Sequence, residues 1–153
     1  MSMDDLYAKP GYLIRRAQQI AVAIFMDECA SFDLTPVQYA AMVAIEENPE
    51  IDATRLSALV AFDRSTLGNV LERLETKGLV HRGPSKSDKR VKLLQLSPDG
   101  KALLRDSQSA VERAQARILG GLPDGDRMQL IKLLSQLVSL YDTELRSSQR
   151  SAD

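Results

Sequence analysis

The sequence predicts a mainly α-helical protein built around a winged helix-turn-helix domain with a β-hairpin wing. Two short amphipathic segments follow each other closely between residues 52 and 77, and a turn-rich basic segment then separates two apolar runs between residues 79 and 96. Tightly joined helices followed by a basic hairpin are typical of this fold. Long apolar segments at both ends add N- and C-terminal helices that we expect to form a dimerisation region.

The second helix of the pair spans residues 64–77. Its apolar residues recur at i, i+3, i+4 and i+7, and so line one face: Leu67, Val70, Leu71 and Leu74. Asp63 can cap the start of this helix, and Gly78 suits the left-handed position that ends one. The helix is therefore bounded on both sides.

The opposite face of this helix carries polar and cationic side chains: Arg64, Ser65, Thr66, Asn69 and Arg73. Such groups can hydrogen-bond base edges and phosphates in a major groove. The alternative is a face that meets only water. Upstream, Asp52 caps a helix with Leu56, Leu59 and Val60 on one face, and the connection around Ala61 and Phe62 is short. This arrangement favours the DNA-reading interpretation.

The predicted wing is a two- or three-stranded sheet whose turn, GPSKSDK, joins LVHR to VKLLQL. Three cations lie at or beside this turn: Lys86, Lys89 and Arg90. Residues 62–92 hold eight Lys or Arg against four Asp or Glu, a net of +4, whereas residues 1–61 hold four against nine, a net of -5. Positive charge is therefore concentrated on the elements expected to meet DNA.

Further helices flank this part. Apolar residues at helical spacing predict a long helix over residues 10–30, and Thr35 with Pro36 begins another that ends near Glu47. After the wing, Ser97 and Pro98 repeat the cap-and-proline pattern at the start of a helix of about five turns. The chain of 153 residues is thus expected to be one domain, with residues 33–97 as the DNA-binding part and residues 10–30 and 98–146 as dimerisation helices.

The last helix, from about Asp126, is apolar over more than half of its circumference. Its large apolar side chains are Leu130, Ile131, Leu133, Leu134, Leu137, Val138, Leu140 and Tyr141. A monomer would leave such a surface in water, so we expect a second subunit to cover it. The alternative is a helix buried wholly within one subunit.

Composition excludes several other classes. No apolar run approaches the ~20 residues of a membrane span, and the acidic N-terminus is unlike a signal peptide, so a cytoplasmic protein is expected. The sequence has no glycine-rich phosphate loop and no cluster of metal ligands, which predicts neither a cofactor nor an enzyme. Cys29, the single cysteine, is expected to pack as a small apolar residue rather than to sense oxidants, and His81 to be structural or solvent-facing.

Several ordered motifs resemble the MarR family of bacterial transcriptional regulators. They are LTPVQYAAM, the segment from Ile51 to Phe62, DRSTLGNVLERLETKGLV and SDKRVKLLQLSPDGKALL. The family's wing pattern, Asp-x-Arg, a hydrophobic strand, then Ser or Thr, an acidic residue and Gly, matches Asp88, Arg90, Leu94, Leu96, Ser97, Asp99 and Gly100. The resemblance covers roughly residues 10–146.

The resemblance implies a homodimeric repressor that binds a pseudopalindromic double-stranded DNA operator and is released by a small effector. It also implies that Asp88 holds Arg90 in place. Members often bind aromatic carboxylates, for which this chain offers Tyr12, Arg15, Arg16 and Gln19 within two turns of the first long helix. Salt bridges at a dimer edge are the alternative for these residues. Two rival functions stay open, a DNA-binding or architectural protein without effector control and a helical protein-interaction module.

Overall fold

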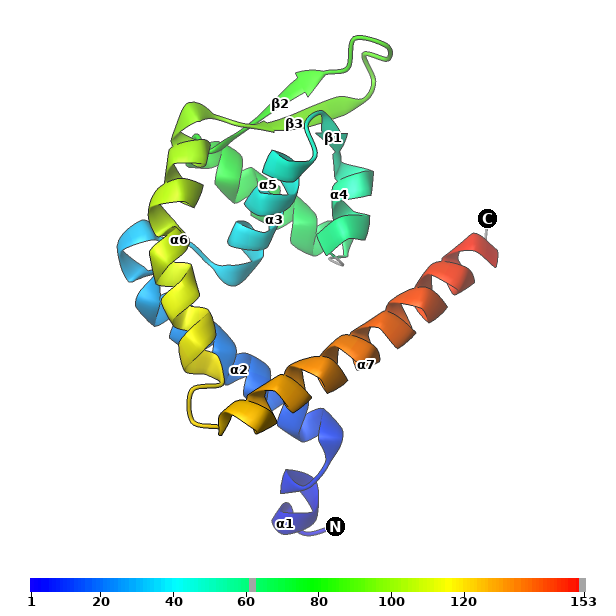
Figure 1. Ribbon diagram of the computed structural model, residues 1–153. Helices are drawn as coiled ribbons and strands as arrows, with labels where there is room; N and C mark the ends of the chain where they lie inside the picture. Colours follow the sequence, from blue (N-terminus) through cyan, green and yellow to red (C-terminus); the bar gives the residue numbers. More distant parts are fainter. Residues whose placement is uncertain (61–62, 152–153) are drawn as a thin grey trace. The chain divides into compact units, whose positions relative to one another are not determined.

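The computed structural model describes residues 1–60 and 63–151, with side chains up to Asp142. It is mainly helical with one small antiparallel sheet, as predicted (Figure 1). The chain forms two compact units, Met1–Gln115 and Ala116–Asp153. The predicted short connection at Ala61 and Phe62 lies outside the described residues.

The first unit begins with two helices and a 3₁₀ turn: α1 Met3–Tyr7, α2 Pro10–Glu28 and η1 Ala30–Phe32. The winged helix-turn-helix follows as α3 Pro36–Glu47, β1 Ile51–Asp52, α4 Ala53–Val60, α5 Arg64–Thr76, β2 Val80–Pro84 and β3 Lys92–Leu96. Helix α6, Pro98–Ile118, crosses the boundary between the units, and α7 spans Asp124–Ser151. Helix α7 is longer than expected, and α1 was not predicted.

The helix ends confirm the predicted caps. Thr35 and Gln38 form a reciprocal capping box at α3, in which the Gln38 backbone N–H donates to Thr35 Oγ1 at 3.2 Å. Asp52 and Asp63 accept first-turn backbone N–H groups of α4 and α5 at 2.8 and 2.7 Å. Gly78, after α5, has φ +72°. Local hydrogen bonds thus set where these three helices begin.

The sheet has the strand order β1-β3-β2, and both pairs are antiparallel. Ile51 lies opposite Leu94, and Val80 lies opposite Leu96. The wing is therefore three-stranded, and β2 continues through Gly83 and Pro84, which the sequence placed in the turn. In Figure 1 the tip of the β2–β3 hairpin extends beyond helices α3, α4 and α5.

One core holds the winged helix together. Its largest fully buried side chains come from every element and include Leu34, Met42, Ile51, Leu56, Leu71, Leu74 and Leu94. Each fully buried side chain of this size contributes roughly 1.5–3 kcal/mol. A smaller cluster, Phe25, Cys29, Ala110, Val111 and Ala114, packs α2 against α6. Apolar packing on its inner face thus holds α5 within this core.

Helix α7 of the second unit carries many exposed apolar side chains. They are Met128, Ile131, Leu133, Leu134, Leu137, Val138, Leu140 and Tyr141. These side chains give α7 an apolar surface. No helix within residues 1–60 and 63–151 is long and apolar enough to cross a bilayer.

Candidate nucleic-acid interface

Helix α5 presents its polar face to the surface. The predicted contact residues Arg64, Ser65, Asn69 and Arg73 are exposed and Thr66 is half-buried, while Leu67, Val70, Leu71 and Leu74 are buried on the opposite face. Ser65, Thr66, Asn69 and Arg73 therefore share the face that points away from the buried residues, whereas Arg64 is exposed at the start of the helix, in line with Leu67 and Leu71.

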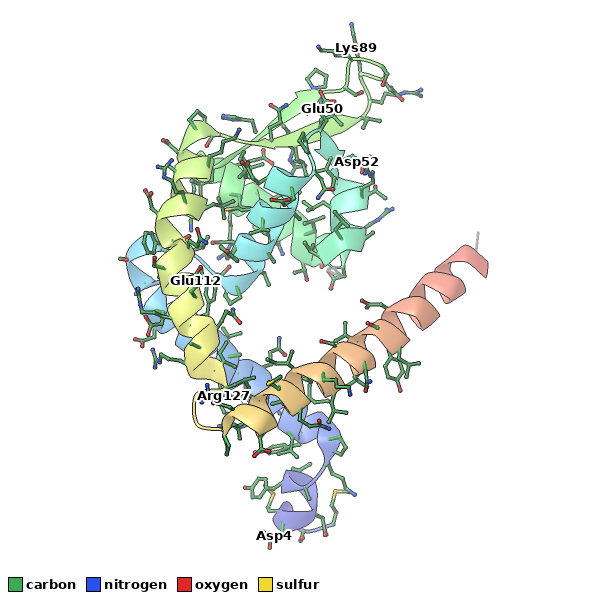
Figure 2. All side chains as sticks on the ribbon, in the orientation of Figure 1. Asp4, Glu50, Asp52, Lys89, Glu112 and Arg127 are labelled. Carbon is green, nitrogen blue, oxygen red and sulfur yellow. The ribbon has the colours of Figure 1, made fainter. Side chains whose placement is uncertain are left out.

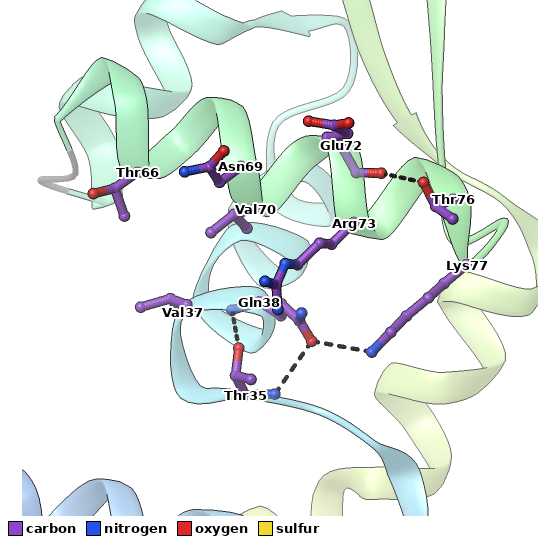
Figure 3. Close-up of a pocket in the computed structure, with 10 residues that line it drawn as sticks. All are labelled: Thr35, Val37, Gln38, Thr66, Asn69, Val70, Glu72, Arg73, Thr76 and Lys77. Carbon is purple, nitrogen blue, oxygen red and sulfur yellow. Dashed lines mark hydrogen bonds between the residues drawn. The ribbon is translucent and has the colours of Figure 1, made fainter.

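A groove of about 800 Å³ runs between α5 and the first turn of α3. Thr66, Asn69 and Arg73 line one side of it, and Figure 3 shows Arg73 reaching from α5 toward Gln38. Thr35, Val37 and Gln38 line the other side. Nothing in the sequence indicated that α3 lies at this surface, although Thr35 and Pro36 correctly predicted where that helix begins.

The start of α5 is organised by Asp63. The backbone N–H of Thr66 donates to the Asp63 carboxylate at 2.7 Å, and the Ser65 hydroxyl donates to the same oxygen at 3.2 Å. These hydrogen bonds, chiefly the one from Thr66, lower the pKa of Asp63 below its usual value of 3.8. The cap therefore stays anionic at neutral pH, and the Ser65 hydroxyl is oriented by it.

The wing tip is held by its own hydrogen bonds. Asp88 Oδ1 accepts from the backbone N of Arg90 at 3.0 Å and from its Nε at 3.3 Å, so the predicted Asp88–Arg90 contact is present. The Arg90 side chain is nevertheless 93% exposed. Lys86 and Lys89 are exposed as well, and Figure 2 places Lys89 at the tip of the hairpin. The tip thus offers cations free to meet phosphates.

An ion pair between Arg82 on β2 and Glu75 on α5 joins the wing to the helix. This pair was not predicted from the sequence, because the spacing of two charged residues on different elements does not show that their side chains meet. His81, beside Arg82, is exposed, in keeping with the predicted solvent-facing role.

The proposed effector residues lie on α2. Tyr12 is half-buried and its ring centroid is 5.3 Å from that of Tyr7 on α1. Arg15, Arg16 and Gln19 are exposed, and Arg16 Nη1 donates to Gln19 Oε1 at 2.7 Å. Among the four candidates, the structure therefore couples Gln19 to Arg16.

Cys29 is 1% exposed within the α2–α6 cluster, as expected for a small apolar residue. Burial raises the pKa of its thiol, and the neighbouring Glu28 carboxylate raises it further. The thiol form therefore dominates at neutral pH, which disfavours reactivity at this position.

Comparisons with known proteins agree with this geometry. Residues 34–92 match the MarR family model. The chain is 32% identical, over 83% of its length and 77% of the relative's, to a putative transcriptional regulatory protein for the hcr operon of Thauera aromatica. This chain belongs to the MarR family. It is a transcriptional regulator of that family.

Solved structures of regulators have the same fold. One is BpsR from Bordetella bronchiseptica, whose DNA binding is regulated by 6-hydroxynicotinic acid. Its structure superimposes on this chain with a TM-score of 0.80 at 29% identity, covering 86% of this chain and 94% of that one. Another is the repressor CouR from Rhodococcus jostii RHA1, bound to a 23-mer DNA duplex. It superimposes with a TM-score of 0.81 at 28% identity, covering 90% of this chain and 98% of that one. The fold thus matches that of proteins whose ligands are DNA and a small aromatic acid.

Proposed function

We propose that this MarR-family regulator binds operator DNA with α5 in the major groove and the wing along the neighbouring backbone or minor groove. The observation that carries the proposal is the exposed face of Ser65, Asn69 and Arg73, which lies opposite four buried side chains of α5, with the exposed Arg64 at the start of the helix. Side chains of this kind hydrogen-bond base edges and phosphates, and the cations Lys86, Lys89 and Arg90 suit the backbone. CouR bound to a DNA duplex supports this arrangement.

A homodimer is part of the proposal. Residues 33–97 would be the DNA-binding part, while residues 10–30 and 98–146 would pair two subunits through the exposed apolar side chains of α7, such as Leu137 and Leu140. Two-fold symmetry then places two copies of α5 in successive major grooves, about 10 base pairs apart, and calls for a pseudopalindromic operator. Such a dimer acts as a repressor when it occludes a promoter.

A small aromatic acid is the proposed effector. Tyr12, Arg15, Arg16 and Gln19 supply a ring, two guanidinium groups and an amide on one helix, and an arginine can hold a carboxylate through two parallel hydrogen bonds. The regulation of BpsR by 6-hydroxynicotinic acid supports this ligand class. The effector must prefer the DNA-free conformation, since equal affinity for both conformations would release nothing.

The DNA-binding proposal is tested with the duplex that the protein selects from a randomised pool, compared with poly(dI-dC). Asn69→Ala should weaken binding to the selected duplex by ~1–3 kcal/mol and leave poly(dI-dC) binding nearly unchanged, because it removes a base contact. Gln108→Ala, which removes an exposed amide from α6, should change neither. Equal losses on both DNAs would show that Asn69 reads no base, and failure to select any duplex would refute sequence-specific binding.

The effector proposal is tested by titrating 6-hydroxynicotinate and a panel of aromatic acids into the DNA complex. Arg15→Ala or Arg16→Ala should retain binding to the selected duplex and lose release by the active acid. If both variants respond like the wild type, these arginines have no sensing role. If no acid in the panel releases DNA from the wild-type protein, a DNA-binding protein without aromatic-acid control is favoured.

A further inference from the structure

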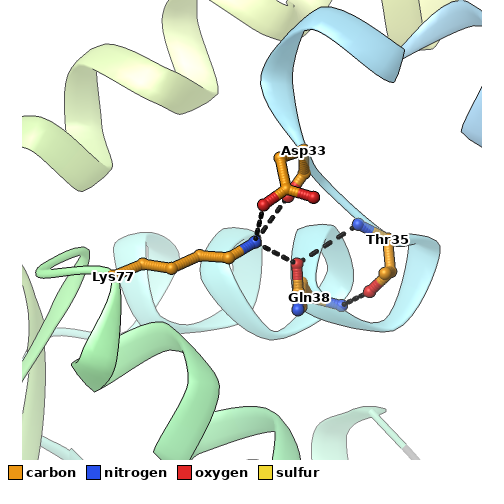
Figure 4. Close-up of polar contacts among 4 residues, drawn as sticks. All are labelled: Asp33, Thr35, Gln38 and Lys77. Carbon is orange, nitrogen blue, oxygen red and sulfur yellow. Dashed lines mark hydrogen bonds and ion pairs between the residues drawn. The ribbon is translucent and has the colours of Figure 1, made fainter.

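Lys77, the C-cap residue of α5, connects this helix to the start of α3. Its Nζ donates to the backbone oxygen of Asp33 at 2.5 Å and lies 3.1 Å from the Asp33 carboxylate (Figure 4). It also lies 3.4 Å from Gln38 Oε1. One ammonium group thus joins residues that are 44 and 39 positions away in the sequence.

The two partners of Lys77 are themselves held in place. Gln38 is only 3% exposed, and its side-chain oxygen also accepts the backbone N–H of Thr35 in the capping box, at 3.3 Å. Asp33 adopts a left-handed conformation with φ 48° at the end of η1, in the short connection to α3. Hydrogen bonds to charged groups are stronger than neutral ones, so the ammonium ties the end of α5 to this connection and to the first turn of α3.

This contact lies at one end of the groove between α3 and α5. Lys77 and Gln38 line that groove together with Thr66, Asn69 and Arg73. Because α5 is a single rigid helix of 13 residues, a shift at its last turn moves the exposed side chains of its first turns. Asp33 also follows η1, which connects it to α2, so the contact lies between α2 and the DNA-facing helix.

We propose that Lys77 is a positioning residue that sets the angle at which α5 presents its polar face, acting through Asp33 and Gln38 and not by contacting DNA. The proposal rests on the proposed DNA-binding function. A positioning role and a phosphate contact of Lys77 predict different effects on DNA affinity, because its partner Asp33 is an acid with 89% of its side chain exposed. Electrostatics alone predicts that removing this acid tightens DNA binding, whereas positioning predicts that binding weakens.

The experiment compares Lys77→Met and Asp33→Asn in the full-length protein, using the duplex selected by the wild type. Asparagine tolerates the left-handed conformation, so Asp33→Asn removes the charge without new backbone strain. Each variant should lose about two- to thirtyfold in affinity, and the double variant should lose less than the two combined. The slope of affinity against salt concentration should stay that of the wild type, because no phosphate contact is lost.

Two further variants complete the set. Glu50 is the other non-glycine residue with positive φ in the described chain, at φ 63°. Glu50→Gln therefore removes an acid from a similar backbone conformation, and it should not weaken DNA binding. Lys77→Arg should restore most of the affinity lost in Lys77→Met. Unchanged or tighter binding by Asp33→Asn, or a salt slope lowered by about one unit in Lys77→Met, would overturn the positioning role.

A second measurement does not depend on DNA. Backbone N–H residual dipolar couplings report the angle between α3 and α5, and this angle should change in Lys77→Met and Asp33→Asn but not in Glu50→Gln. An unchanged angle would refute the inference even where DNA binding is weakened. If the wild-type protein selects no duplex, the DNA-binding proposal fails, and the couplings still decide whether Lys77 orients α5.

Discussion

Gly100 on α6 lies directly against the backbone carbonyl of Leu79, so close that a Cβ on Gly100 would come within 3.0 Å of that oxygen. The same oxygen accepts the backbone N–H of Ser97 at 2.9 Å. Ser97 Oγ in turn donates to the Gly78 carbonyl at 2.6 Å and accepts the Gly100 N–H at 3.0 Å. The end of α5, the wing and the start of α6 therefore meet at one tightly packed corner.

Gly100→Ala should destabilise the protein by about 1–3 kcal/mol, because the added methyl group meets backbone that cannot move aside easily. The matched control is Gly68→Ala on α5, where a Cβ meets nothing within 4 Å. That change should raise stability by roughly 0.5–1 kcal/mol, since alanine favours helix. Denaturant unfolding followed by circular dichroism measures both, and equal effects of the two substitutions would contradict the packing argument.

The cap of α5 predicts a pH dependence. The Thr66 N–H lowers the pKa of Asp63, so the stabilisation is present above the unfolded-state pKa and is lost as pH falls through the lower folded-state pKa. Asp63→Ala should therefore melt below the wild type at pH 7, and the gap should shrink as the pH falls below about 4. Asp63→Asn, which still caps but does not titrate, should lose less at pH 7. A gap that is constant with pH would exclude the carboxylate as its source.

The wing predicts an effect opposite to that of simple electrostatics. Asp88→Ala removes two hydrogen bonds to Arg90 along with a negative charge, and it should weaken operator binding because Arg90 loses its fixed position. Lys86→Ala and Lys89→Ala should instead weaken binding to all DNA and lower the salt slope by about one unit per phosphate contact. Anisotropy titrations over a range of salt concentrations distinguish these cases, and tighter binding by Asp88→Ala would argue against positioning.

The apolar surface of α7 predicts obligate pairing. Leu137→Glu should weaken the homodimer by roughly 2–4 kcal/mol, because it places a charge in a desolvated interface. Leu59→Glu, at a residue of α4 that is also exposed, should leave the oligomeric state unchanged. Analytical ultracentrifugation at micromolar concentration gives the result. A monomeric wild-type protein under those conditions would refute the dimer.

The sequence predicted the winged helix well, because its signals are local. The boundaries of α5 follow from Asp63 and Gly78, and its inner face follows from its four buried side chains. None of these signals depends on the rest of the chain. The polar contact candidates on this helix followed from the same periodicity. Helix α1 was missed because it is only five residues long, although its capping box, formed by Ser2 and Asp5, is as local a signal as the other helix caps.

Contacts between distant segments could not be predicted. The pairs Lys77–Asp33 and Arg82–Glu75 join side chains that look like ordinary surface charges until the fold brings them together. The candidate effector residues show the same limit, since helical spacing allowed Gln19 to face either arginine and only the structure pairs it with Arg16. Sequence spacing defines a helix face, but the partner of a long flexible side chain depends on tertiary packing.

The pairing of Ile51 with Leu94 closes the chain into a loop that contains α4, α5 and β2. Forming this strand pair therefore carries the entropic cost of closing a long loop, and the helix-turn-helix cannot separate from the wing without breaking that pair. The whole DNA-facing part should consequently open and refold as one cooperative unit. Native-state hydrogen exchange should then show one shared opening free energy for the amides of α5 and β3.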